Sequence, residues 1–425
     1  ILPSSPPSMP FSGRGASMVH MSVEVPDSDE LLRLTSPAVY GDGGVARGGA
    51  LHLSSVLPAV SDAIGSPVTT RVHANPAALR DAMGMPRASS VIVVLVDGLG
   101  YWNIASRIGH APYLRSLLAD SVNSRPISTC SPSTTVAAMA TFGTGSCPGL
   151  TGMTGYTQCN PATGQLCQLI QFRDAPDPQD LQRMPTVFET LSGRGVRVTS
   201  VGLPKFSNSP LTRAALRGPD YHGSIRPTDR VRLACEAARE PGLTYLYIRD
   251  TDKVGHNYGW NSDHWIAAFE GVDAQLHLLR RRAPQGTLIV ITADHGMIEV
   301  DPDQRIDIAE HPELARGVRL VGGEPRAVML YAEDDAGPDE VAERWQNILG
   351  ERAVVRTRAQ AIASGMFGPV DDWVRPMIGD VLVHAAGRVT IVDSRTQTDK
   401  ATRLPSVHGS LSMAESDIPL LMDVA

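Results

Sequence analysis

Short apolar runs rich in β-branched residues recur along the chain and predict buried strands. They span residues 91–96, 196–201, 244–248, 287–292, 327–331 and 380–384. Helical patterns lie between several of these runs. In residues 262–281 the apolar side chains fall on one helical stripe, and Ser262 can cap the start of that helix. A shorter helix is predicted within 186–195, where two glycines stop it.

The alternation of strands and helices predicts an α/β fold with an open, mostly parallel central sheet flanked by helices. Residues 333–375 differ, because two helical stretches surround one short strand-like segment, and we expect a small inserted α+β subdomain there. Residues 1–30 are rich in Pro, Ser and Gly and predict a disordered or artificial extension. The remainder, 31–425, is expected to form one domain.

Composition narrows the class of protein. Apolar residues make up 42% and charged residues 20%, as in ordinary soluble proteins. The net charge of −7 and the lack of a long basic run argue against binding to polymeric nucleic acid. No apolar run approaches the roughly 20 residues that a membrane span needs. Five cysteines without CxxC spacing, and no apolar signal-peptide core, predict reduced thiols and a cytoplasmic location.

Acidic and histidine residues follow the predicted strands. In open α/β sheets, ligands collect at the carboxyl ends of strands. Each acid beside a glycine is also an ordinary turn residue, so only the whole set is informative. Together they offer the mixed nitrogen and oxygen ligands that suit zinc, with manganese as the alternative. The set consists of Asp97, Asp252, His256, Asp294, His295 and His408, with Asp250 nearby.

A candidate nucleophile lies in the segment SPSTT, directly before a helix of small residues. A hydroxyl at a helix N-terminus lies where backbone N–H groups favour an anion. Metal coordination can lower the pKa of such a hydroxyl and activate it. The alternative is that Ser133, Thr134 and Thr135 only cap the helix.

The ordered set VDGLG, SPSTT, DTDKVGH, ADHG and HGS resembles the alkaline phosphatase superfamily, and within it the nucleotide pyrophosphatase/phosphodiesterase branch. The resemblance covers about residue 50 to the C-terminus. It is closest to bacterial cytoplasmic members with PSTT and TGY motifs, which include cyclic di-AMP phosphodiesterases. It implies an alkaline-phosphatase-like core with two divalent ions, zinc first and manganese second. It assigns Thr135 as nucleophile. The implied ligands are Asp97, Thr135, Asp294 and His295 for one ion, and Asp252, His256 and His408 for the other.

Some positions depart from the better-known secreted branch. Ser131 precedes Pro132 where that branch has phenylalanine, and Thr151 and Tyr156 replace its His-Gly and asparagine region. The candidates for the contact to the phosphoryl oxygen are therefore Tyr156 and the backbone N–H of Thr135. Thr134 stands where a sulfatase motif requires arginine, which excludes that activity.

Residues 126–172 contain no Asp, Glu, Lys, Arg or His. An uncharged surrounding favours a singly charged diester over a doubly charged monoester. The sequence thus predicts a two-metal phosphodiesterase that converts cyclic di-AMP to a linear dinucleotide and AMP through a phosphothreonine intermediate. Tyr156, Lys205 and His222 are the predicted substrate contacts. The alternatives are a nucleotide pyrophosphatase, a phosphomonoesterase or mutase on the same metals, and a non-catalytic nucleotide-binding protein. The oligomeric state stays open.

Overall fold

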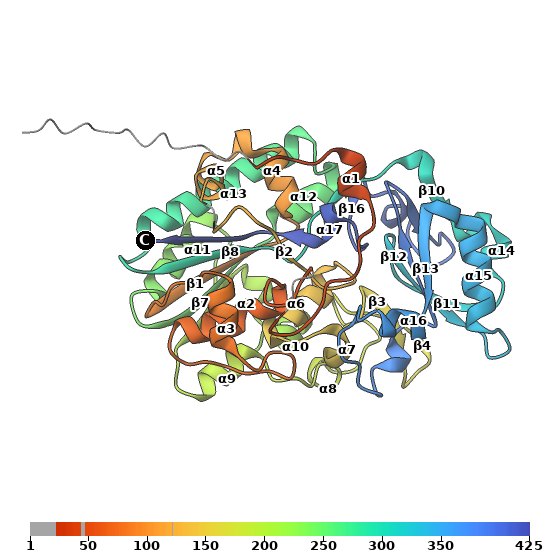
Figure 1. Cartoon of the computed structure of the whole chain (residues 1–425), viewed down its shortest axis with the longest axis horizontal. Helices are drawn as coiled ribbons and strands as arrows, with labels where there is room; N and C mark the ends of the chain where they lie inside the picture. The colour runs from red at the N-terminus through yellow and green to blue at the C-terminus, as the bar shows by residue number, and fades with distance from the viewer. Residues whose placement is uncertain (1–22, 44–46, 121) are drawn as a thin grey trace, which may run out of the picture.

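A six-stranded sheet runs through the larger part of the molecule (Figure 1). The computed structural model describes residues 23–43, 47–120 and 122–425. The strand order is β18-β8-β1-β7-β5-β6, in which all neighbours are parallel except β18 and β8. The strands are β1 (Ser90–Val96), β5 (Val198–Gly202), β6 (Asp220–Gly223), β7 (Gly242–Ile248), β8 (Leu288–Thr292) and β18 (Leu420–Val424).

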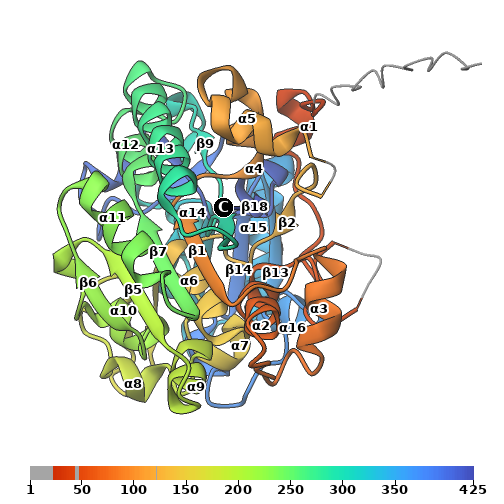
Figure 2. The same ribbon diagram turned by 90° about the vertical axis from the view of Figure 1, so that its left-hand side faces the viewer.

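Helices cover both faces of this sheet (Figures 1 and 2). One face carries α5 (Pro112–Leu118), α11 (Pro227–Ala237), α12 (Asp250–Tyr258) and α13 (Asp263–Arg282). The other carries α2 (Leu53–Ala63), α3 (Pro76–Ala82), α6 (Thr135–Thr144), α9 (Val187–Gly193) and α10 (Pro210–Ala215). Burial on both faces explains why every residue of β1 is buried and why all of them except Ser90 are apolar. The expected mostly parallel α/β fold is confirmed.

The predicted helix boundaries follow from local hydrogen bonds. The side chain of Ser262 accepts a bond from the Trp265 backbone N–H and caps α13. The buried residues of α13 include Phe269, Val272 and Leu276, three members of the predicted stripe. At α9, Thr186 and Glu189 form a reciprocal capping box.

A second sheet of four antiparallel strands lies beyond the end of the first, with order β11-β12-β14-β13. Its strands are β11 (Val318–Glu324), β12 (Ala327–Ala332), β13 (Ala353–Thr357) and β14 (Val381–Ala385). The apolar runs 327–331 and 380–384 therefore belong to this sheet and not to the central one. Helices α15 (Pro338–Leu349) and α16 (Arg358–Ala363) accompany it. Residues of the second sheet and α15 form an apolar core of their own, which contains Trp345. The boundaries 333–375 of the expected subdomain stay a prediction.

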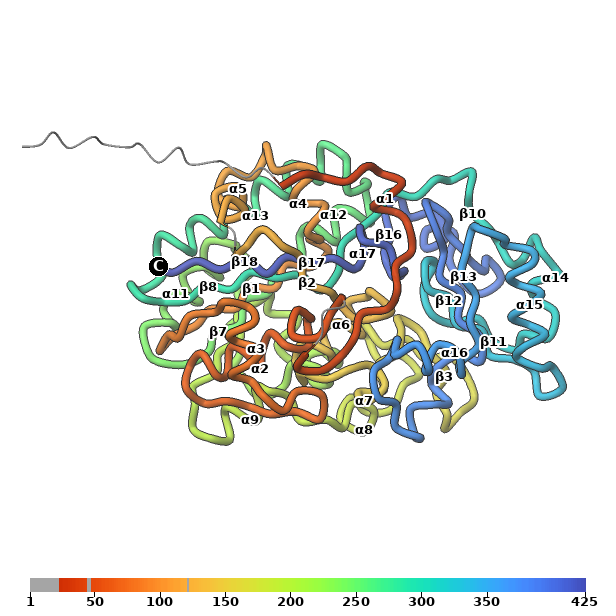
Figure 3. The backbone as a smooth tube through the Cα atoms, viewed as in Figure 1, coloured from red at the N-terminus to blue at the C-terminus, as the bar shows by residue number. Residues whose placement is uncertain are grey.

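The first described segment lies beside the C-terminal part of the chain, as Figure 3 shows. The Thr35 backbone N–H donates to the carbonyl of Leu411 at 3.0 Å. Residues 1–22 of the extension expected over 1–30 lie outside the described residues, and α1 (Ser28–Leu32) begins after its cap, Asp27. Within the described ranges, no helix combines the length and apolar character needed to cross a membrane. The five cysteines are buried and free.

Candidate active site

Strand order brings the predicted acidic residues together. Asp97 follows β1, which lies between β7 and β8. Asp252 lies in α12, directly after β7, and Asp294 follows β8. Because the three strands are parallel, their carboxyl ends meet at one edge of the sheet. The structure therefore places three carboxylates from distant parts of the sequence around one point.

Six candidate ligands form two adjacent groups, one of Asp97, Asp294 and His295 and one of Asp252, His256 and His408. Within each group one ligand atom per residue lies within 4.8 Å of the others. In the second group, Asp252 and His256 are four residues apart on α12, so they share a helix face, with Oδ1 and Nε2 3.2 Å apart. The rings of His295 and His408 stack at 3.5 Å between centroids and join the two groups.

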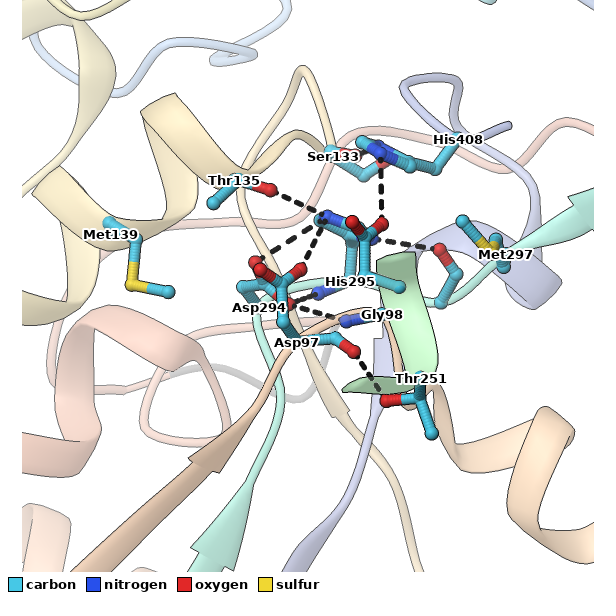
Figure 4. Close-up of polar contacts among 12 residues, drawn as sticks. Asp97, Gly98, Ser133, Thr135, Met139, Thr251, Asp294, His295, Met297 and His408 are labelled. Carbon is cyan, nitrogen blue, oxygen red and sulfur yellow. Dashed lines mark hydrogen bonds and ion pairs between the residues drawn. The ribbon is translucent and has the colours of Figure 1, made fainter. Parts of the chain in front are cut away.

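Thr135 faces the first group from the start of α6. Its Oγ1 lies 3.1 Å from Nε2 of His295, as Figure 4 shows. Thr134 occupies the N-cap position of α6, so Thr135 is the first helical residue. The Thr135 hydroxyl thus combines a helix N-terminus with contact to a candidate ligand, the arrangement expected of an activated nucleophile.

Hydrogen bonds orient the histidine rings. In each of the three histidines, Nδ1 lies beside a backbone carbonyl, which makes Nδ1 the protonated nitrogen and leaves the Nε2 lone pair free. The partners are the carbonyls of Gly296 for His295 at 2.9 Å, Ser406 for His256 at 2.8 Å and Ser133 for His408 at 2.8 Å. All three rings therefore present Nε2 to the groups described above.

The carboxylates are held by neighbours and yet retain free oxygens. Gly98 and His295 both donate backbone N–H bonds of 3.0 Å to Oδ1 of Asp294. The Tyr247 hydroxyl donates to Oδ2 of Asp97. The other oxygens of these two carboxylates, Oδ1 of Asp97 and Oδ2 of Asp294, are buried without a hydrogen-bond partner. The same is true of Oδ1 of Asp252. Buried acceptors without partners are costly, so this donor set fits divalent cations well.

The pKa shifts of these groups also fit a site for divalent cations. Burial raises the pKa of Asp97 well above its usual value, and the charges of Asp294 and Asp252 raise it further. Burial alone would also raise the pKa of Asp252, but His256 and His408 outweigh it and lower this pKa. Burial and the neighbouring His295 lower the pKa of His408 well below its usual value. A bound cation would stabilise the ionised carboxylates and neutral imidazoles that metal coordination requires.

Gly98 explains why a glycine follows Asp97. Its φ is +70°, and a Cβ there would lie 2.9 Å from Cα and Cβ of Asp252. A side chain at this position would therefore push the two ligand groups apart, besides straining the backbone.

Thr135 and Asp97 line a cleft of about 530 Å³. Lys205, one of the predicted substrate contacts, also lines it, together with Phe206 and Leu211. The predicted substrate contacts Tyr156 and His222 are not among its lining residues. The Tyr156 hydroxyl instead accepts a bond from Gln168 at 2.9 Å, and the exposed His222 pairs with Asp220 at 3.1 Å. Their substrate contact stays a prediction that the structure does not support.

The structure adds residues that the sequence did not suggest. Tyr247 faces the same side of β7 as Tyr245, and both line the cleft, a placement that their spacing of two could have indicated. Glu324 reaches the site from the end of β11, where a Cβ on Gly409 would lie 2.8 Å from its Cγ. Burial raises the pKa of Glu324 to about 8. A single glutamate in a strand of the second sheet carries no sequence signal that would place it beside the candidate ligands.

Comparison with solved structures shows the same fold. Murine ectonucleotide pyrophosphatase/phosphodiesterase 5 aligns over 78% of this chain and 87% of its own, with a TM-score of 0.62 and 16% identity. Phosphonoacetate hydrolase from Sinorhizobium meliloti 1021, in complex with phosphonoformate, aligns over 79% and 90%, with a TM-score of 0.62 and 21% identity.

Among curated proteins, phosphopentomutase from Sinorhizobium fredii is 31% identical over 114 residues, which are 26% of this chain and 27% of that protein. Phosphopentomutase from Rhizobium meliloti matches over the same shares with 31% identity. The chain thus spans about a quarter of the length of the curated relatives it matches. The family model for type I phosphodiesterase/nucleotide pyrophosphatase matches residues 91–411, a range that contains Thr135 and all six candidate ligands. The chain therefore belongs to the type I phosphodiesterase/nucleotide pyrophosphatase family.

Proposed function

We propose that this protein is a metal-dependent nucleotide phosphodiesterase that uses Thr135 as its nucleophile. The observation that carries the proposal is the position of the Thr135 hydroxyl, 3.1 Å from Nε2 of His295 and open to the cleft. A hydroxyl with a purely capping role would need neither a candidate ligand beside it nor a cleft before it.

Two divalent ions are the proposed cofactors, zinc first and manganese second. Asp97, Asp294 and His295, together with the Thr135 oxygen, would hold one of them. Asp252, His256 and His408 would hold the other. Such ions lower the pKa of a hydroxyl and stabilise charge on phosphoryl oxygens. The proposed location is the cytoplasm, where the thiols of the five cysteines would stay reduced.

Thr135 carries the covalent step. Its hydroxyl loses a proton to solvent, and Oγ1 forms a bond to phosphorus while the bond to the leaving nucleoside oxygen breaks and that oxygen takes up a proton. Water then attacks the phosphothreonine diester, which releases the product and restores the hydroxyl. The α6 N-terminus directs backbone N–H groups toward the phosphoryl oxygens.

A phosphodiester is the proposed substrate class, with cyclic di-AMP as the leading single candidate. The stretch 126–172, which contains Thr135, supplies no charged side chain of its own, and this favours a substrate with one negative charge. The choice of cyclic di-AMP rests on resemblance to cytoplasmic family members. AMP, with which the murine relative has been determined in complex, is a nucleotide of the same kind as the proposed product.

Paired variants test the nucleophile. Thr135→Ala should lower kcat/KM for a diester by about 10³-fold or more, because the covalent route is lost. The matched control is Thr134→Ala, which removes the neighbouring N-cap hydroxyl and should cost far less. A larger loss in Thr134→Ala would contradict the assignment.

The partial match to phosphopentomutases favours a second candidate, phosphoryl transfer to or from a monoester. Bis-p-nitrophenyl phosphate and p-nitrophenyl phosphate separate the two. We expect the diester to be the better substrate. A tenfold advantage for the monoester, about 1.4 kcal/mol of transition-state preference, would replace the diesterase proposal with the second candidate.

A further inference from the structure

Three positively charged side chains line the same cleft as Thr135 and Asp97. Lys205 lies in a short 3₁₀ turn (Pro204–Phe206), Arg249 directly precedes α12 and Lys253 lies within it. We call these three residues the cationic cluster. It lies in a protein whose net charge is −7, so overall composition does not explain it.

Two members of the cluster, Lys205 and Arg249, lie near one aromatic ring. Lys205 Nζ lies 4.9 Å from the centroid of the Phe206 ring, and Arg249 Cζ lies 5.8 Å from it. The charges also influence one another: desolvation lowers the pKa of Lys205, and Arg249 and Lys253 lower it further. Like charges brought together in this way repel each other unless an anion lies between them.

None of the three cations forms a side-chain hydrogen bond or ion pair to another described residue. Nε of Arg249 is buried and has no acceptor. Nearby arginines are paired, since Arg213 contacts Asp177 at 2.7 Å and Arg217 contacts Glu189 at 2.9 Å. Arg213 and Arg217 therefore have the carboxylate partners that the three cations of the cleft lack.

Two aromatic rings lie between Lys205 and Arg249 on one side and the candidate ligand Asp97 on the other. Lys253, the third member of the cluster, directly follows the candidate ligand Asp252 in α12. Phe206 packs edge-on against Tyr247, with centroids 5.7 Å apart, and the Tyr247 hydroxyl donates to Asp97. A phosphate that reacts with Thr135 lies on the Asp97 side of these rings. Lys205 and Arg249 thus face a different part of any bound substrate.

We propose that the cationic cluster binds a second phosphate of the substrate, one nucleotide away from the phosphodiester that is cut. This inference rests on the proposed nucleotide phosphodiesterase function and narrows its substrate class to nucleotides with two separate phosphate groups. Lys205, Arg249 and Lys253 supply the charge, and Arg249 also supplies directional N–H donors. Phe206 and Tyr247 form the apolar wall between the two phosphate positions.

Two dinucleotides test the proposal, ApA and its 5′-phosphorylated form pApA. Both contain the same scissile bond and differ in one terminal phosphate. We expect the metal-loaded protein to prefer pApA by at least tenfold in kcat/KM, and the preference to shrink as salt screens the charges. In Lys205→Met and Arg249→Met the ratio of pApA to ApA should fall toward one. The control is Arg226→Met, which removes an exposed arginine outside the cleft lining and should keep the ratio.

Binding separates this inference from the proposed function. Calorimetry with the metal-loaded Thr135→Ala protein measures the affinities for pApA and ApA without turnover. If ApA, pApA and bis-p-nitrophenyl phosphate all resist cleavage by the parent protein, the proposed diesterase function fails. A tenfold affinity ratio of pApA to ApA that Lys205→Met removes would still support phosphate binding by the cationic cluster. A ratio below two in the parent protein, or an equal effect of Arg226→Met, overturns the inference.

Discussion

A buried ion pair that connects the second sheet to the loop of His408 should be essential for stability. Arg326, in the turn between β11 and β12, and Glu415 both have fully buried side chains. Nε and one terminal nitrogen of Arg326 donate to the two Glu415 oxygens at 3.1 and 2.8 Å. Glu415 also accepts the backbone N–H of Ser410, two residues after His408, at 2.9 Å.

The substitution Arg326→Met removes one partner and leaves a buried carboxylate without a counter-charge. Breaking a buried pair in this way costs about 3–5 kcal/mol, which is a large part of the roughly 5–15 kcal/mol that stabilises a typical protein. In the double variant Arg326→Met/Glu415→Gln no charge remains buried. The combined loss should therefore be smaller than the sum of the single losses by about 1–3 kcal/mol.

Guanidinium unfolding of the metal-free protein, followed by tryptophan fluorescence, measures these differences. The control pair is Arg232 and Glu236, which lie four residues apart on the exposed face of α11 at 2.8 Å. Arg232→Met should change the unfolding free energy by less than about 1 kcal/mol, because exposed pairs are weak. If Arg326→Met costs no more than Arg232→Met, or the double variant is fully additive, the reasoning is refuted.

Gly98→Ala should lower kcat/KM at least tenfold, because its Cβ would lie 2.9 Å from Asp252 and the backbone there is left-handed. The control Gly109→Ala has open space around its Cβ and should keep the activity. Equal activities of the two variants would contradict the close approach. Burial lowers the pKa of His384 to about 3 from an unfolded value of 6.5, so the folded state disfavours the protonated ring. The free energy of unfolding is therefore not reduced by this histidine above pH 6.5 and falls as the pH drops below that value. His384→Leu should therefore reduce the loss of unfolding free energy between pH 6.5 and 5 by about 2 kcal/mol, and an unchanged pH slope in denaturant titrations would argue against it.

Local patterns by themselves determined the elements of this protein. Apolar β-branched runs such as 91–96 and 288–292 form strands because they can be covered on both faces, and Ser262 begins α13 because its side chain satisfies a free backbone N–H. The same patterns place Asp97 and Asp294 directly after strands, which is why both could be singled out without a structure.

Only the tertiary structure decided which elements are neighbours. The position of β1 between β7 and β8 joins Asp97 to Asp252 and Asp294, and the run 327–331 pairs with a second sheet although it reads like a central strand. Strand partners depend on contacts between residues far apart in the chain, which local periodicity does not encode. For the same reason Glu324 and the cationic cluster carry no local signal, since their roles arise from the distant segments that surround them.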